Sequence, residues 1–314
     1  MDVERRGSAV ELSSRYLGAG LGLLLGDAHG APHEGGPLEK ALWWLIGRTH
    51  GKRRFTDDSQ MAFDLGEHLV QYGKIEHQKL LLQFADSYRW SRGYGPSTVT
   101  VLKAARRGLD WQKATRVRFP AGSFGNGAAM RIAPLAVFLH QRVQPEEAIP
   151  WFQQSAEVTH PHPLAMDGAV ALGLCILLSF DEVDCFEILK HVTNSMETTA
   201  MKEKLQRVTE TLKENSTQSA RAAKKSLGAG TAALESVPLS IYLGFRYRES
   251  GFEELLESAN RGGGDTDTIA AMAGALWGSQ RGDSDFDSSL LNNTEAVDEM
   301  RSLMMRLSEK NILQ

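Results

Sequence analysis

The chain has 314 residues, enough to bury one large hydrophobic core or two smaller ones. Its formal net charge of −4 excludes the strongly basic surface typical of nucleic-acid-binding proteins, so we expect no specific nucleic-acid partner. The two cysteines, Cys175 and Cys185, are too few for a disulfide framework or a thiolate zinc site.

The start of the chain, MDVERRGSAVELSSRYLG, lacks the apolar core of a signal peptide, and the apolar stretch LGAGLGLLLG is too short to span a membrane. We therefore expect a globular, cytoplasmic protein with no membrane partner, and a monomer.

Helical periodicity runs through nearly the whole chain, and no stretch alternates like a half-buried strand. This favours an all-α fold: one domain over residues 1–314, with a core at about 12–280, built as a compact orthogonal bundle of a dozen or more helices. The polar region 191–226 is predicted to be a solvent-facing helical excursion. Helices are expected at 11–26, 58–72, 76–91, 97–108, 127–140, 145–158, 164–180, 182–214, 219–249, 252–260, 267–279 and 293–310. Small residues in LGAGLGLLLGDAHGA and GALWG indicate helices packed closely at the centre.

The first predicted helix ends in GLLLGDAHGAPHEGGP, where Gly26 is expected to terminate it. Asp27 and Glu34 then fall in the irregular segment that follows. From spacing alone, the favoured interpretation of Glu34 is an ordinary exposed loop carboxylate, and a functional role is the alternative.

Each of two amphipathic helices is preceded by its own pair of carboxylates beside a hydroxyl. Thr56, Asp57 and Asp58 stand in RRFTDDSQMAFDLGEHL, and a similar arrangement recurs in RGGGDTDTIAAMAGALWG with Asp265 and Asp267. Helix N-capping explains only one carboxylate in each stretch. A capped surface loop is the alternative to a functional site.

Both stretches offer oxygen ligands and no neighbouring cysteine or histidine. Hard cations prefer such ligands, magnesium first and calcium or manganese next, whereas zinc favours nitrogen or sulfur. Four aspartates brought together without a cation would repel one another, and two divalent ions about 3.5–4 Å apart would remove that repulsion. The glycines Gly263 and Gly264 would let a ligand approach the main chain.

A glycine-rich turn and a histidine-containing turn complete the set of candidate segments. AGSFGNGAAMRIAPLAVF places Gly122, Ser123, Gly125, Asn126 and Gly127 at an expected helix entrance, where free amides can bind phosphate. VTHPHPLA adds His160 as a candidate ligand contact. Taken singly, each segment is also compatible with a simple turn or loop.

Taken together and in this order, these stretches resemble the ADP-ribosylglycohydrolase family. The resemblance rests on GDAHGAPHE at 26–34, TDDSQM at 56–61, RGYGPST at 92–98, GSFGNGAAMR at 122–131, TH at 159–160 and GGDTDTIAAMAGALWG at 263–278. It implies a compact all-α fold with a central pair of magnesium ions, for which manganese could substitute. The implied metal ligands are Thr56, Asp57, Asp58, Asp265, Asp267 and Thr268.

The resemblance also implies a reaction, namely hydrolysis of the bond between the anomeric ribose carbon of ADP-ribose and a modified acceptor, most simply a protein arginine. Glu34 matches a glutamate that assists or gates catalysis, alongside Asp57, Asp58 and Asp267 at the reacting centre. The implied substrate-binding residues are Phe119 and Phe124 for adenine, Gly122, Ser123, Gly125, Asn126 and Gly127 for the diphosphate, and His160, Gly263 and Gly264.

Two positions depart from the commonest pattern of the family: Ser59 replaces a threonine, and Phe124 replaces a tyrosine without losing the ring. The acceptor stays open at this point among arginine, serine, polymeric ADP-ribose and modified nucleobases. A crystallin-like relative without activity, or a module that binds ADP-ribose without turnover, are the alternatives from other functional classes.

Overall fold

Two small-residue helices lie side by side, in antiparallel directions, at the centre of the molecule. The structure is a computed structural model that describes residues 11–214, 220–261 and 263–310. Helix α1 (Leu12–Gly30) and helix α15 (Thr266–Arg281) are buried along most of their length. Their backbones touch, since a Cβ on Gly22 would lie 2.0 Å from the Gly274 carbonyl oxygen, and one on Gly278 would lie 1.9 Å from that of Gly18. The expectation of closely packed central helices is confirmed.

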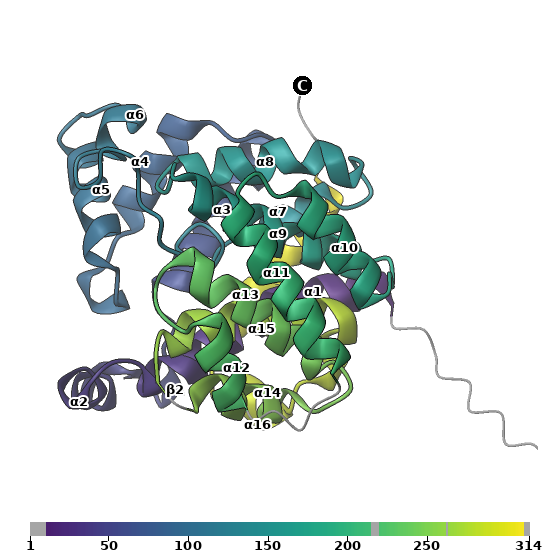
Figure 1. Ribbon diagram of the computed structural model, residues 1–314. Helices are drawn as coiled ribbons and strands as arrows, with labels where there is room; N and C mark the ends of the chain where they lie inside the picture. The colour runs from purple at the N-terminus through teal and green to yellow at the C-terminus, as the bar shows by residue number, and fades with distance from the viewer. Residues whose placement is uncertain (1–10, 215–219, 262, 311–314) are drawn as a thin grey trace, which may run out of the picture.

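Other helices wrap this central pair (Figure 1). Helices α13 (Ala233–Arg246) and α14 (Phe252–Asn260) pack on α15, whereas α17 (Val297–Glu309) packs on both α1 and α3 (Asp57–Tyr72). A Cβ on Gly20 would lie 2.6 Å from the Met304 side chain, which shows how tightly α17 is seated. The packed core therefore also includes residues beyond 280.

Helices account for most of the remaining described chain. They are α2 (Pro37–Ile46), α4 (His77–Ser87), α5 (Pro96–Arg106), α6 (Trp111–Ala114), α7 (Ala133–Leu139), α8 (Pro145–Glu157), α9 (Pro163–Ser179), α10 (Cys185–Ser195), α11 (Thr199–Lys213), α12 (Ala220–Leu227) and α16 (Ser288–Asn292), with short 3-10 turns at Ala31–His33, Trp90–Arg92 and Asp283–Asp285. Within the described ranges, strands are limited to the hairpin of β1 (Arg48–Thr49) and β2 (Lys52–Arg53). The all-α prediction is confirmed.

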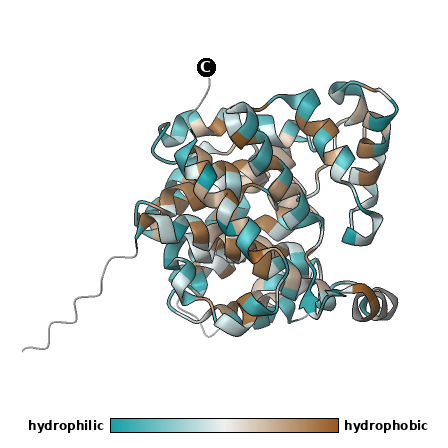
Figure 2. Cartoon of the chain, turned by 180° about the vertical axis from the view of Figure 1, so that it is seen from behind, coloured by the Kyte–Doolittle hydropathy of each residue, from teal (hydrophilic) through white to brown (hydrophobic). Residues whose placement is uncertain are grey.

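The picture of the chain shows a body with two outlying parts. Helices α4, α5 and α6 lie together along one side, and α2 projects from the lower edge (Figure 1). Seen from behind, apolar residues gather on the inward sides of the helices and polar residues on their outer sides (Figure 2). No helix among the described residues has the length and apolar character needed to cross a membrane.

Several predicted boundaries were wrong. Helix α1 continues through Gly26 to Gly30, because Gly26 serves close packing: a Cβ there would lie 2.1 Å from the Ala270 carbonyl oxygen. The helix expected at 127–140 begins only at Ala133, and 182–214 divides into α10 and α11, where Thr198 caps the second helix. Residues 219–249 likewise form α12 and α13, and α2 was not predicted. Expectations for residues 1–10, 215–219, 262 and 311–314 lie outside the described residues.

Candidate active site

The N-termini of α3 and α15 meet at the C-terminal end of α1. Neither N-terminus is capped by the side-chain carboxylate of its own N-cap residue. At α3 the cap is Thr56, whose hydroxyl accepts a hydrogen bond of 3.3 Å from the Asp58 amide. At α15 the N-cap position is held by Asp265, but its side chain makes no capping bond. The capped-loop alternative therefore does not account for Asp265, and the aspartates are available for another role.

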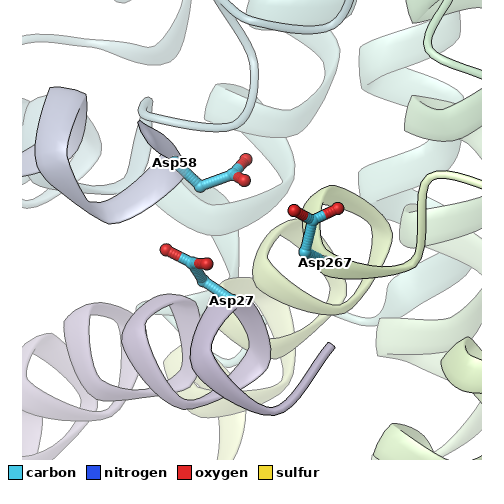
Figure 3. A group of neighbouring side chains, drawn as sticks. All are labelled: Asp27, Asp58 and Asp267. Carbon is cyan, nitrogen blue, oxygen red and sulfur yellow. The ribbon is translucent and has the colours of Figure 1, made fainter. Parts of the chain in front are cut away.

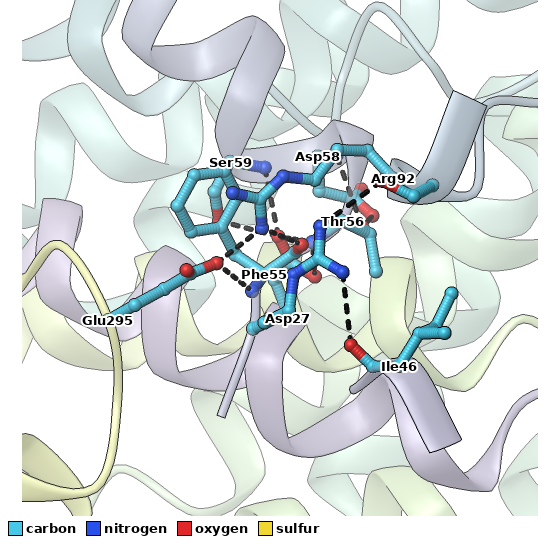
Figure 4. Close-up of polar contacts among 10 residues, drawn as sticks. Asp27, Ile46, Phe55, Thr56, Asp58, Ser59, Arg92 and Glu295 are labelled. Carbon is cyan, nitrogen blue, oxygen red and sulfur yellow. Dashed lines mark hydrogen bonds and ion pairs between the residues drawn. The ribbon is translucent and has the colours of Figure 1, made fainter. Parts of the chain in front are cut away.

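Asp27 fastens the start of α3 to α1. It lies within α1 rather than in a loop, is fully buried, and accepts bonds from the Thr56 amide at 2.9 Å and from the Ser59 amide and hydroxyl at 3.0 and 2.5 Å (Figure 4). The sequence predicts no role for Asp27, because Gly26 has the appearance of a helix terminator and places Asp27 in the irregular segment that follows. An aspartate inside an otherwise apolar helix was the signal available.

Arg92 and Glu295 hold the backbone of the residue before Thr56 through hydrogen bonds. The Arg92 guanidinium donates a 2.6 Å bond to the Phe55 carbonyl and pairs with Glu295, which accepts a 3.0 Å bond from the Phe55 amide (Figure 4). Arg92 begins the motif RGYGPST. This motif thus contributes to the site by fixing the backbone that carries the Thr56–Asp58 segment.

Two groups of three carboxylates share Asp267. Asp27, Asp58 and Asp267 form one group, and Glu34, Asp265 and Asp267 form the other; in each, one oxygen per residue lies within 4.8 Å of the others. Figure 3 shows the first group, with side chains from α1, α3 and α15 pointing toward one another. The structure thus brings together the two aspartate stretches that lie about 200 residues apart in the chain.

Burial and mutual repulsion oppose ionisation of these carboxyls. The pKa of Asp58 is raised well above its usual value by burial and then by the charges of Asp27 and Asp57. Burial also raises the pKa of Asp267, and the nearby charge of Glu34 adds to the effect. A bound cation would reverse this repulsion, because it favours the ionised forms.

One buried oxygen in the cluster lacks a hydrogen-bond donor among the residues that the structure describes. Within that part of the chain, the Asp58 Oδ1 atom has no hydrogen-bond partner, whereas Oδ2 accepts bonds from the hydroxyls of Thr56 at 2.9 Å and Thr268 at 3.3 Å. A buried carboxylate oxygen without a donor is unfavourable unless another positive group meets it. The oxygen-only donors and this orphaned atom fit a hard divalent cation.

A cleft of about 270 Å³ opens onto the cluster. Twelve of the predicted site residues line it: Glu34, Asp57, Phe119, Ser123, Phe124, Gly125, Asn126, Gly127, His160, Asp265, Asp267 and Thr268. The other lining residues have no role predicted from the sequence; they are Gly93, Gly95, Pro96, Ser97, Thr98, Arg118, Met130 and Thr231. Five of the missed residues fall within RGYGPST, so this motif was the available signal.

Five predicted site residues lie outside the cleft lining: Thr56, Asp58, Gly122, Gly263 and Gly264. Asp58 belongs to the buried carboxylate cluster, and the Thr56 hydroxyl donates a hydrogen bond to it. Two glycines serve backbone packing, since a Cβ on Gly122 would lie 2.8 Å from the Pro161 side chain and one on Gly264 would lie 2.3 Å from the Ala229 carbonyl oxygen. Both have positive φ, of 89° and 96°, which favours glycine.

The glycine-rich turn contacts the carboxylate cluster through Asn126, and the helix that follows it begins only at Ala133. The Asn126 amide group donates bonds of 2.6 Å to Asp265 and 2.9 Å to Ser236, so it orients an aspartate of the cluster. His160 lies against Gly127, where a Cβ would come within 2.6 Å of the ring. Burial lowers the pKa of His160 to about 3, which leaves the ring neutral at physiological pH.

Aromatic side chains stand at the outer end of the cleft. The rings of Phe119 and Phe124 are 5.9 Å apart, and Phe124 is 47% exposed. A large exposed ring beside a polar cleft is suited to stacking on a planar group of a ligand.

The sequence matches the family model described as ADP-ribosylglycohydrolase over residues 8–314. The chain belongs to the ADP-ribosylglycohydrolase family. Membership makes it a glycosidic-bond hydrolase that acts on ADP-ribose linkages. It is 30% identical to "ADP-ribosylhydrolase ARH3" of Danio rerio, over 95% of this chain and 91% of the relative, and 30% identical to that of Homo sapiens, over 94% and 93%.

Similar proteins of unassigned function and a similar fold are also known. This family member is 29% identical to "Uncharacterized protein YegU" of Escherichia coli, over 92% of its length and 94% of that protein. A solved structure named "ADP-ribosylglycohydrolase-related protein complex" superposes with a TM-score of 0.69 at 23% identity, covering 95% of this chain and 98% of that one. This likeness supports the all-α fold.

Proposed function

We propose that the chain is a magnesium-dependent hydrolase that releases ADP-ribose from a modified protein. The observation that carries this proposal is the pair of carboxylate groups sharing Asp267 at the inner end of a cleft whose outer end is aromatic. A ligand with a hydroxyl-rich sugar at one end and a planar base at the other matches that division.

Magnesium is the cation that the donor set suits best, with manganese as a substitute. The residues proposed to hold two ions are Thr56, Asp57, Asp58, Asp265, Asp267 and Thr268. When bound, such ions supply positive charge that holds ribose hydroxyls and lowers the pKa of a water. Asp57 lines the cleft. Burial raises its pKa, and the charges of Asp27 and Glu34 add to the effect, so it faces the same centre as the other aspartates.

Glu34 is proposed to move a proton during the reaction. Its half-buried carboxylate lies in the cleft, within 4.8 Å of Asp265 and Asp267 oxygens. Water attacks the anomeric carbon, the bond to the acceptor breaks, and the proton lost by the water passes by way of Glu34 to the leaving group. Nearby carboxylates stabilise the positive charge that develops on the ribose in the transition state.

The remaining lining residues are proposed to bind the nucleotide. Backbone amides of the Ser123–Gly127 turn would meet the diphosphate, and the Phe119 and Phe124 rings would stack on adenine. The neutral His160 ring packs against Gly127 of this turn. Its position explains why glycine is needed at 127.

Protein arginine is the acceptor proposed. A protonated guanidinium leaving group is favoured beside the Glu34 carboxylate, which is outside the proposed set of metal ligands, because opposite charges attract. The partner is then an ADP-ribosylated protein. The expected cytoplasmic location and monomeric state stay predictions.

The test is to incubate the protein with magnesium and a panel of arginine-linked, serine-linked, polymeric and nucleobase-linked ADP-ribose, and to follow free ADP-ribose. We expect release, fastest from the arginine linkage. Release from a different linkage only would replace the acceptor. Tight binding of ADP-ribose without release from any substrate would favour a binding module instead.

A further inference from the structure

The cleft has a strongly uneven distribution of charge. Its described lining contains four carboxylates and one side chain that is cationic at neutral pH, Arg118. His160 does not alter this balance, because burial lowers its pKa to about 3. The carboxylates in the lining are Glu34, Asp57, Asp265 and Asp267.

Arg118 stands at the aromatic end of the cleft. Its guanidinium carbon is 5.6 Å from the centre of the Phe119 ring, which in turn is 5.9 Å from that of Phe124. The side chain is exposed. A planar guanidinium beside an aromatic ring presents its N–H groups sideways, where a planar base stacked on the ring would bring its attached sugar and phosphates.

We propose that Arg118 binds a phosphate group of the ligand and so makes the cleft specific for phosphate-bearing nucleotides. This inference rests on the proposed function. Acidic residues line the inner end, and an anionic ligand needs a cation to balance its own charge at the outer end. Arginine is suited to this because its fork of donors bonds phosphate oxygens in pairs.

Two phosphates could supply the same chemistry. One is the diphosphate that joins adenosine to the ribose held at the inner end. The other is a phosphate attached through the adenosine ribose, as in a ligand that extends beyond the first unit. Both would lie near a base stacked on Phe119 or Phe124.

If Arg118 were only a solvent-exposed side chain that binds no ligand, the result would be different. An exposed cation–π contact contributes little to stability. Removing such a side chain would shift the melting temperature slightly and leave every ligand affinity unchanged. The discriminating quantity is therefore the affinity for phosphate-bearing ligands relative to adenosine, which lacks phosphate.

The experiment measures binding of ADP-ribose, 2′-phospho-ADP-ribose and adenosine by calorimetry in magnesium buffer, for the wild-type chain, Arg118→Ala and Arg118→Lys. Arg107→Ala is the matched control, because it removes one exposed arginine at the end of α5 with the same change of charge. Melting temperatures confirm that each variant is folded.

We expect Arg118→Ala to weaken ADP-ribose binding about tenfold, which is roughly 1.4 kcal/mol, with adenosine unaffected and lysine restoring part of the loss. A loss confined to 2′-phospho-ADP-ribose would support the proposal with the outer phosphate as the ligand. Unchanged ratios to adenosine for both nucleotides would overturn it, while leaving the proposed function intact. A wild-type chain that binds no ADP-ribose would overturn the proposed function and this inference together.

Discussion

Replacing Asp58 with asparagine removes one charge from the buried cluster while keeping the size of the side chain. Asp58 shares oxygen contacts within 4.8 Å with Asp27 and Asp267, so each ionised pair repels by at least about 3.5 kcal/mol at an effective dielectric constant of about 20. Protons taken up by the cluster relieve part of this repulsion. We therefore expect Asp58→Asn to raise the free energy of unfolding of the metal-free protein by about 1–3 kcal/mol.

The pH dependence has a defined sign. Because the folded-state pKa values of these carboxyls are raised, the native state holds more protons than the unfolded chain above pH 3.8. Stability is therefore lost as pH rises through the raised values. The gain from Asp58→Asn should accordingly be larger at about pH 8 than at about pH 5.

The assay is urea unfolding in EDTA and in excess magnesium. The wild-type chain should gain about 2.7 kcal/mol at a magnesium concentration of 100 times its Kd, and Asp58→Asn should lose most of that gain. Asp64→Asn is the control, since Asp64 is a buried aspartate on the same helix that bonds Ser87 outside the cluster. An Asp58→Asn variant that is less stable in EDTA, yet gains as much from magnesium as wild type, would refute the reasoning.

Three further outcomes are expected. Glu34→Gln should depress kcat strongly while ADP-ribose still binds within about tenfold of wild-type affinity, and steady-state kinetics with an unchanged kcat would return Glu34 to a solvated loop role. Between pH 6.5 and about pH 4, the unfolded chain binds a proton on His160 that the buried ring does not bind, so the wild-type protein loses stability as pH falls. His160→Asn should reduce this loss by about 3 kcal/mol. Urea unfolding that shows the same pH dependence of the unfolding free energy for both proteins would contradict this. Gly22→Ala should destabilise by about 3 kcal/mol, since its Cβ would lie 2.0 Å from the Gly274 carbonyl oxygen, and an unaltered melting temperature would count against that packing.

The features that could be predicted from the sequence are those set by residues close to one another in the chain. Helical periodicity indicated the all-α fold, and the repeated threonine and aspartate pattern indicated the two helix starts that the structure brings together. Small residues in α1 and α15 indicated close packing, since only glycine permits backbones to touch as they do at Gly22.

The features that were missed depend on contacts between distant segments. Gly26 has the same appearance in sequence as a helix terminator, and only its proximity to Ala270 explains why α1 continues to Gly30. The role of Asp27 follows from that continuation, because it is the buried position in α1 that reaches Thr56 and Ser59. The bracing of Asp265 by Asn126 joins residues 139 positions apart, which no local pattern could reveal.

The most direct test of the account is the release of ADP-ribose from an ADP-ribosylated protein by the wild-type chain and by Asp267→Asn, each measured in magnesium and in EDTA. Asp267 is the residue that both carboxylate groups share. We predict release by the wild-type chain in magnesium, its loss in EDTA, its return when magnesium is restored, and a fall of orders of magnitude in Asp267→Asn under every condition. Equal release in EDTA, or near-normal release by Asp267→Asn, would contradict the assignment of a metal-dependent hydrolase to this cluster.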